Sequence, residues 1–205
     1  MPAPQPAGPG GGLSAFATLP PAPKHRNPLD QITPVTDLKL VHSADGEWLT
    51  WRRSYDDLGF SPLKQNNRTN ARDLRVAWTW SLPAGPNEMT PLVHDGVLFV
   101  FGFGDHVEAL EAASGDLLWE YSRQRPKEVL PSVKRNLALY GDRLLVPSSD
   151  SHLVALDIKT GKVIWDRAIG DYRACFRITG GPLAAKDKVN EGVEGRAPGE
   201  EPAGP

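Results

Sequence analysis

The sequence has a single cysteine, Cys175, and it carries neither a long apolar run nor an excess of either charge. One cysteine excludes an intrachain disulfide and a metal site built from several thiolates. No apolar stretch approaches the roughly 18 residues that a membrane-spanning helix needs. The 23 basic and 25 acidic residues are scattered, and the net charge is −2. We therefore expect no nucleic-acid partner and no membrane span.

The two ends of the chain are poor in residues that build a core. Nine of the first 34 residues are proline, and a run of three glycines begins at Gly10. Such a composition cannot bury enough apolar surface to offset the entropy of ordering. We expect disorder over residues 1–30, a folded part over 31–190 and a disordered tail over 191–205. The first 23 residues show no charged and apolar regions typical of an export signal.

Two copies of one pattern organise the middle of the chain. Residues 109–119 read Ala-Leu-Glu-Ala-Ala-Ser-Gly-Asp-Leu-Leu-Trp, and residues 155–165, 46 positions later, read Ala-Leu-Asp-Ile-Lys-Thr-Gly-Lys-Val-Ile-Trp. A fainter copy, Leu74-Arg-Val-Ala-Trp78, keeps only the end of the pattern. A fixed period of this length, built from strand and turn residues, predicts a repeat fold.

Short apolar runs alternate with turn residues around these copies. Asp95-Gly96, Ser114-Gly115, Gly141-Asp142 and Thr160-Gly161 each separate two runs, which predicts antiparallel hairpins. Four short strands closing on a tryptophan predict an all-β fold, a partial β-propeller of about two complete four-stranded blades with partial flanking blades. We expect each indole to fill the gap between blades near the rim, with its N–H on a backbone partner. A repeating β-sandwich is the alternative.

Less regular structure is predicted before the first blade. Residues 31–43 are compatible with one short helix capped near Thr36 or Asp37, and residues 70–74 with a helical turn. Residues 47–63 combine aromatics with Asp, Gly and Pro, which indicates an ordered, packed loop. Residues 75–82 alternate polar and apolar side chains, which predicts a strand.

The pattern Ala-x-Asp-x-x-x-Gly-x-x-x-Trp resembles the tryptophan-docking motif of quinoprotein dehydrogenases, eight-bladed propellers that carry pyrroloquinoline quinone (PQQ). Non-enzymatic propellers share this motif. More specific is the pair of segments beginning at Trp48 (Trp-Leu-Thr-Trp-Arg-Arg-Ser-Tyr-Asp) and Phe60 (Phe-Ser-Pro-Leu-Lys-Gln), which resembles the N-terminal region of PQQ-dependent alcohol dehydrogenases. The resemblance covers residues 46 to about 189.

The resemblance implies four cofactor-binding residues. Glu88 lies in a Glu-x-Thr-Pro segment, and Arg135 lies in a segment whose arginine contacts the acidic groups of the quinone. Ser148 and Thr179 match two hydroxyls that face the cofactor. A guanidinium suits this task because it can pair bidentately with a carboxylate or an ortho-quinone edge. Each of the four also has an ordinary structural interpretation, as a solvated charge or as a hydroxyl that bonds the backbone.

Two features of the family are missing. Val129 and Leu130 occupy the positions of a vicinal cysteine pair found in many members. Ala197 occupies the position of a calcium-ligating glutamate, and Glu194 is close to it in sequence. The metal ligands are therefore left unknown, and the catalytic aspartate base of the family has no counterpart in this chain.

The resemblance implies an N-terminal fragment of a PQQ-dependent dehydrogenase that oxidises an alcohol, with PQQ and Ca²⁺ as cofactors and an electron acceptor such as a cytochrome c. It also implies a periplasmic location. No third full copy of the pattern follows, so we expect an open arc that is inactive alone and self-associates through exposed apolar faces. A non-catalytic scaffold that binds a protein partner is the alternative function.

Overall fold

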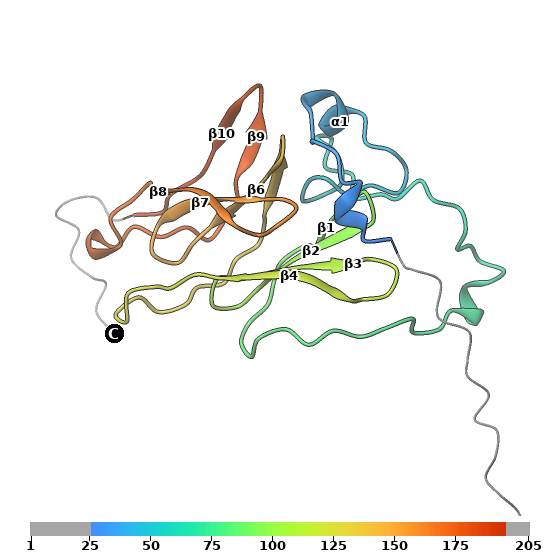
Figure 1. Cartoon of the computed structure of the whole chain (residues 1–205), viewed down its shortest axis with the longest axis horizontal. Helices are drawn as coiled ribbons and strands as arrows, with labels where there is room; N and C mark the ends of the chain where they lie inside the picture. The colour runs from blue at the N-terminus through green and yellow to red at the C-terminus, as the bar shows by residue number, and fades with distance from the viewer. Residues whose placement is uncertain (1–25, 196–205) are drawn as a thin grey trace, which may run out of the picture.

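The computed structural model describes residues 26–195, which form antiparallel sheets with little helix (Figure 1). Two four-stranded sheets, ordered β1-β2-β3-β4 and β5-β6-β7-β8, are followed by the hairpin β9-β10. The first sheet consists of β1 (Leu92–His94), β2 (Val97–Gly102), β3 (His106–Glu111) and β4 (Leu117–Ser122). The second consists of β5 (Ala138–Tyr140), β6 (Arg143–Pro147), β7 (His152–Asp157) and β8 (Val163–Ala168). The hairpin consists of β9 (Leu183–Ala185) and β10 (Lys188–Asn190). Within each sheet every strand pairs with its successor, so the predicted all-β partial propeller is confirmed.

Local turn chemistry explains why these hairpins form. His94 pairs with Val97, so Asp95 and Gly96 alone make the turn, with φ of 47° and 79°. Two positive φ angles define the turn whose twist matches that of the flanking strands. The equivalent alanines of the two repeats, Ala109 and Ala155, each precede the same register shift in the pairing with the outer strand.

The tryptophans of the repeat join neighbouring blades. Trp119 ends the first repeat, and its Nε1 donates to the Ile158 carbonyl oxygen of the second blade at 3.1 Å. Its ring covers Gly161, where an added Cβ would lie 2.6 Å from the indole. Trp78 makes the same contacts one blade earlier, with the Ala112 carbonyl at 3.2 Å and with Gly115. The glycine of each repeat is therefore both a turn residue, as predicted, and the surface on which the preceding tryptophan lies.

One apolar core lies between the two blades and includes the segment that precedes them. Phe99 and Trp119 of the first blade pack in it with a ring-centroid separation of 5.9 Å. Leu144, Val154 and Leu156 contribute from the second blade. A smaller cluster on the other face of the second blade includes Ala184 of β9. Each blade thus buries its inward side chains against a neighbour, as the wedge shape of a propeller blade requires.

A buried ion pair adds to the contact between blades. Arg123 follows β4, and its side chain is 8% exposed. Its Nε and Nη2 donate to the carboxylate of Asp150 at 2.7 and 2.8 Å, and its Nη1 donates to Asp166 at 2.8 Å. The fork of the guanidinium therefore fixes the end of the first blade to two carboxylates of the second.

The segment before the blades ties their turns together. It contains η1 (Pro28–Asp30), α1 (Asp37–Val41) and η2 (Ala71–Asp73); η3 (Tyr172–Ala174) comes later in the chain. Figure 1 shows α1 beside β9 and β10, where the Asp37 carboxylate accepts from the Lys186 amide at 2.9 Å and from the Tyr140 hydroxyl at 3.2 Å. The helix is confirmed with Thr36 as its cap, although it is shorter than residues 31–43. Pro34 disfavours helix before it, and Val35 pairs as a bridge with Gly141 instead.

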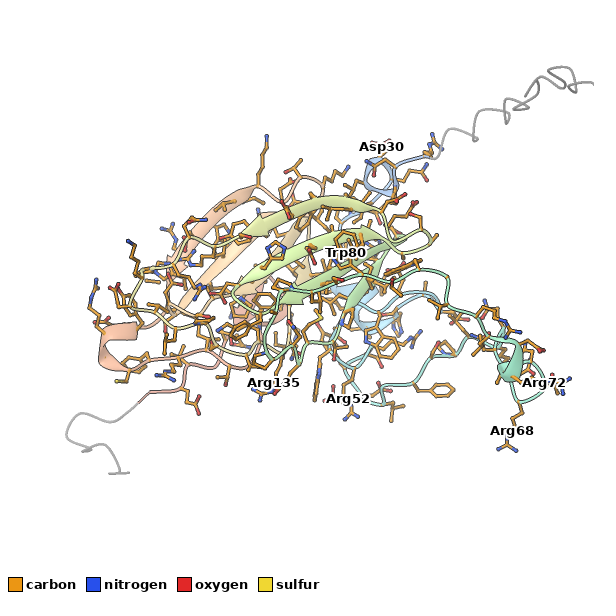
Figure 2. The ribbon with its side chains drawn as sticks, turned by 90° about the horizontal axis from the view of Figure 1, so that it is seen from below. Asp30, Arg52, Arg68, Arg72, Trp80 and Arg135 are labelled. Atoms are coloured by element: carbon orange, nitrogen blue, oxygen red, sulfur yellow. The ribbon has the colours of Figure 1, made fainter. Side chains whose placement is uncertain are left out.

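The strand predicted over residues 75–82 is wrong. These residues form no sheet with any part of the chain that the structure describes. Alternation gives them a polar and an apolar face, but a strand also requires a neighbouring backbone to pair with. Figure 2 shows Trp80 against the first blade, where its Nε1 donates to Glu108 at 2.9 Å. The helical turn predicted over 70–74 is confirmed by η2.

The predicted loop over residues 47–63 is irregular, as expected, but it is only partly packed. Leu49 is buried, whereas Leu58 and Phe60 are 70% and 68% exposed. The predicted boundary at residue 31 lies slightly late, because Leu29 already belongs to the core. Disorder is predicted over residues 1–30 and 191–205, and residues 1–25 and 196–205 of these ranges lie outside the described residues. Residues 191–195 are described by the structure, and Glu194 pairs as a bridge with Arg177. No helix within residues 26–195 is long and apolar enough to cross a membrane.

Candidate functional site

Three of the four predicted cofactor residues meet at one end of the blades. β1, β5 and β9 are the first strands of successive blades, and each is preceded by a segment that lies outside the sheets. Glu88 lies in the segment before β1, Arg135 in the segment before β5, and Thr179 in the segment before β9. Because these segments lead into equivalent strands, they converge. We call Glu88, Arg135 and Thr179 the open-end cluster.

Arg135 holds the open-end cluster together. Its Nη2 lies 3.1 Å from Oε2 of Glu88, and its Nη1 donates to the Thr179 carbonyl oxygen at 3.4 Å. The Thr90 amide donates to the Arg135 carbonyl at 3.2 Å, which fixes the two segments side by side. The Arg135 and Glu88 side chains are 49% and 50% exposed, and Figure 2 shows Arg135 pointing outward from the edge of the sheets. The cluster therefore presents a charged, accessible surface.

Ser148 is not part of this cluster. It is 1% exposed, and its hydroxyl donates to the Asp150 carboxylate and accepts from the His152 amide at 3.1 Å. These bonds close the turn between β6 and β7, so the hydroxyl has a structural role. Thr179 contributes its carbonyl to Arg135 rather than its hydroxyl. The cofactor roles of both hydroxyls stay predictions.

A buried set of charges lies behind the cluster, and sequence reasoning missed it. Lys134 is 3% exposed, and its Nζ donates to Ser132 Oγ at 2.7 Å and to the Ile178 carbonyl. Burial lowers the pKa of Lys134 to about 8. Asp105 is fully buried and accepts from the Ser149 amide at 2.9 Å, while burial raises its pKa.

The sequence signal that distinguishes Lys134 from Arg135 is the alternation of side-chain direction along an extended chain. Adjacent side chains of an extended segment point to opposite faces, so Lys134 and Arg135 cannot both face solvent at the blade surface. Which of the two is buried depends on the neighbouring segment that supplies the Ile178 carbonyl.

His94 has structural partners at both ring nitrogens. His94 is 1% exposed; its Nδ1 lies 2.6 Å from Glu47 Oε2 and its Nε2 lies 2.7 Å from the Thr33 carbonyl oxygen. Burial alone would lower its pKa, but the bonds to Glu47 and Thr33 outweigh burial and raise it. Both ring nitrogens face acceptors, so the imidazolium form ties the N-terminal segment to the first hairpin turn.

No calcium site is assembled around Glu194. Within residues 26–195, the two groups of three potential ligands are Glu47-His94-Asp95 and His106-Glu108-Glu120. Neither includes Glu194, which is exposed and pairs through its backbone with Arg177. Position 197, where the resemblance places a calcium ligand, lies outside the described residues. We therefore derive no step through a metal ion.

The fold and the docked tryptophans define this protein as a partial β-propeller of the tryptophan-docking class. Residues 68–192 match the PQQ_2 family model, whose description reads "Outer membrane protein assembly factor BamB". The match covers more than half of the chain, and several curated relatives are named as quinoprotein or quinohemoprotein dehydrogenases. The chain belongs to the quinoprotein alcohol dehydrogenase family of PQQ-type propellers, which confirms the resemblance inferred from the sequence.

Individual relatives agree with this assignment. Quinohemoprotein alcohol dehydrogenase ADH IIB of Pseudomonas putida is 40% identical over 166 residues, which cover 77% of this chain and 24% of that protein. A 1-butanol dehydrogenase (quinone) of Thauera butanivorans is 36% identical over 169 residues, with 78% and 27% covered. Among solved structures, a europium-containing methanol dehydrogenase superposes with a TM-score of 0.73 at 31% identity, covering 78% of this chain and 29% of its own. The chain thus spans about a quarter of the length of the curated relatives it matches.

Proposed function

We propose that this chain supplies part of the PQQ-binding site of an alcohol-oxidising quinoprotein dehydrogenase. The observation that carries the proposal is the open-end cluster, in which Glu88, Arg135 and Thr179 converge from the leading segments of three successive blades. The relatives that match this chain are named as quinone-dependent alcohol dehydrogenases. The non-catalytic scaffold alternative gains no support from those relatives.

The donor set of the cluster suits a planar group that carries carboxylates and carbonyls. Arg135 makes one short contact, with Glu88, and its hydrogen bond to the Thr179 carbonyl oxygen is long at 3.4 Å. Its half-exposed guanidinium can therefore turn its fork to a carboxylate of a bound ligand. Glu88 balances the charge and keeps the guanidinium oriented. When bound, the ortho-quinone supplies a two-electron acceptor for the oxidation of an alcohol.

The name of one relative supports a proposal for the substrate and for the electron acceptor. We propose a primary alcohol as the substrate and a c-type cytochrome as the electron acceptor, because one relative is named 1-butanol dehydrogenase (cytochrome c). We further propose a periplasmic location. The 205-residue chain by itself is expected to bind the quinone without turnover, because none of its residues matches the catalytic aspartate of the family.

Calorimetric titration of the purified chain with PQQ tests the proposal. Arg135→Lys keeps the charge but loses the planar fork, and it should weaken binding about tenfold or more. Arg143→Lys is the matched control, because Arg143 is 47% exposed and also pairs with one carboxylate, Asp142, but follows the turn at the other end of β5. Absence of binding, or equal weakening by both variants, would contradict the proposed function.

A further inference from the structure

A buried carboxylate lies beside the backbone that follows Thr179 of the open-end cluster. Glu191 follows β10, and both of its carboxylate oxygens are shielded from solvent without a hydrogen-bond partner. Its Oε1 lies 3.9 Å from the position that a Cβ on Gly180 would occupy, and Gly180 directly follows Thr179. A buried carboxylate that receives no donor is poorly stabilised in its ionised form. Glu191 is therefore a group whose charge state responds to what binds next to it.

Among residues 26–195, the charged group that acts directly on Glu191 is Lys134, and other charges act on Lys134 in turn. Lys134 comes from the segment before β5, and the Gly192 amide is near Glu191 but outside hydrogen-bonding geometry. Asp105, Asp150 and Arg125 lie beyond Lys134 and act on that ammonium.

Arg135 and Glu88, the exposed charges of the open-end cluster, are paired with each other, and neither is among the groups that shift the pKa of Glu191. Burial raises the pKa of Glu191 to about 7. The carboxylate is therefore divided between its two forms near neutral pH, whereas a solvated glutamate is ionised there.

We propose that Glu191 takes up one proton from solvent when an anionic quinone binds at the open-end cluster, so that binding is coupled to pH. This inference rests on the proposed function. The carboxylates of the ligand bring negative charge close to Glu191, and the protein between them screens this charge weakly. The repulsion favours the neutral form of Glu191. The step is the protonation of a carboxylate, and no electron is transferred.

The sign of the pH dependence follows from this coupling. Ligand binding raises the pKa of Glu191 above its value in the free protein, so binding takes up a proton in the window between the two values. Affinity is then greatest below the free-state pKa and falls as pH rises through that window. The dissociation constant should rise up to about tenfold per pH unit within the window.

Calorimetry with PQQ at pH 6.0, 7.0 and 8.0, in two buffers of different ionisation enthalpy, measures affinity and proton uptake together. The wild-type chain should take up a fraction of one proton and bind more weakly as pH rises. Glu191→Gln keeps the shape but cannot titrate, so its affinity should change much less with pH. Glu194→Gln is the control, since Glu194 is an exposed glutamate three residues further on, and it should behave as wild type.

The outcomes separate the two proposals. Binding whose pH dependence is equal in wild type and Glu191→Gln overturns the role of Glu191 and leaves the proposed function standing. No binding at any pH overturns the proposed function and this inference with it. A carbon-13 NMR titration of the Glu191 carboxyl without ligand gives an independent check. A midpoint near that of an exposed glutamate would also contradict the inference.

Discussion

The glycine that faces a docked tryptophan allows a sharp test of how the blades are held together. Gly161 has φ of 66°, and an added Cβ would lie 2.6 Å from Cε3 and 2.8 Å from Cδ2 of Trp119. Gly141 has φ of 60°, and a Cβ there would meet nothing within 4 Å. Alanine at either position bears the cost of a left-handed backbone, about 1–2 kcal/mol. Only Gly161→Ala must also displace an indole, which adds about 1–3 kcal/mol.

We therefore expect Gly161→Ala to lower the free energy of unfolding by about 2–5 kcal/mol and Gly141→Ala by about 1–2 kcal/mol. Urea unfolding followed by circular dichroism measures both values, and an unchanged slope shows that the same transition is compared. In a Trp119→Ala background the cost of Gly161→Ala should fall to that of Gly141→Ala, because the two residues are in contact. Equal costs for the two glycines in the wild-type background would refute the docking argument.

Three further changes test other parts of the fold. Trp119→Phe removes the donor to the Ile158 carbonyl and should cost about 1–3 kcal/mol in urea unfolding; a neutral effect would show that this carbonyl finds another partner. His94 has a raised pKa when folded, so its stabilisation is complete below the unfolded pKa and is lost as pH rises through the folded value. The stability difference between wild type and His94→Gln should accordingly be larger at pH 5.5 than at pH 8.5, and a constant difference would contradict the imidazolium assignment. Arg123→Met removes the cation that pairs with two carboxylates of the second blade, and it should lower the free energy of unfolding by about 3–5 kcal/mol. Arg143→Met, at an exposed position, should change it by no more than about 0.5 kcal/mol. Similar values for the two variants would show that the buried ion pair does not join the blades.

The blades could be predicted from sequence because their signals are local. Asp95-Gly96 sets its own turn geometry, and the recurrence of Gly and Trp at one spacing marks each blade. The strand expected over residues 75–82 failed because pairing depends on a backbone elsewhere in the molecule. The position of Trp119 between the blades was expected, but its contact with Gly161 was not, since that glycine lies 42 positions away.

The candidate site was only partly predictable for a related reason. Glu88 and Arg135 stand in distinctive segments, so resemblance located them. Lys134 and Glu191 look like ordinary solvated charges in the sequence, because nothing near them in the chain shows that neighbouring segments bury them. Whether a charge is buried depends on how the blades pack together. For Ser148 the reason is local instead, because its hydroxyl bonds to Asp150 and His152 of its own turn.

The self-association expected of an open arc stays a prediction. Large apolar side chains are exposed on the outer strands of both blades, among them Leu117 at 44% and Val163 at 50%. Sedimentation velocity over a range of concentrations would show association if these faces meet, and a single monomeric species at high concentration would contradict it.

The central claim is that the open-end cluster binds the quinone, and amide NMR of the nitrogen-15-labelled chain tests it most directly. Addition of PQQ should shift the backbone signals of Glu88, Arg135 and Thr179 together, and the signals of His94 and Gly141 at the opposite turns should stay in place. Shifts centred on those turns, or no saturable shift at any residue, would contradict the account.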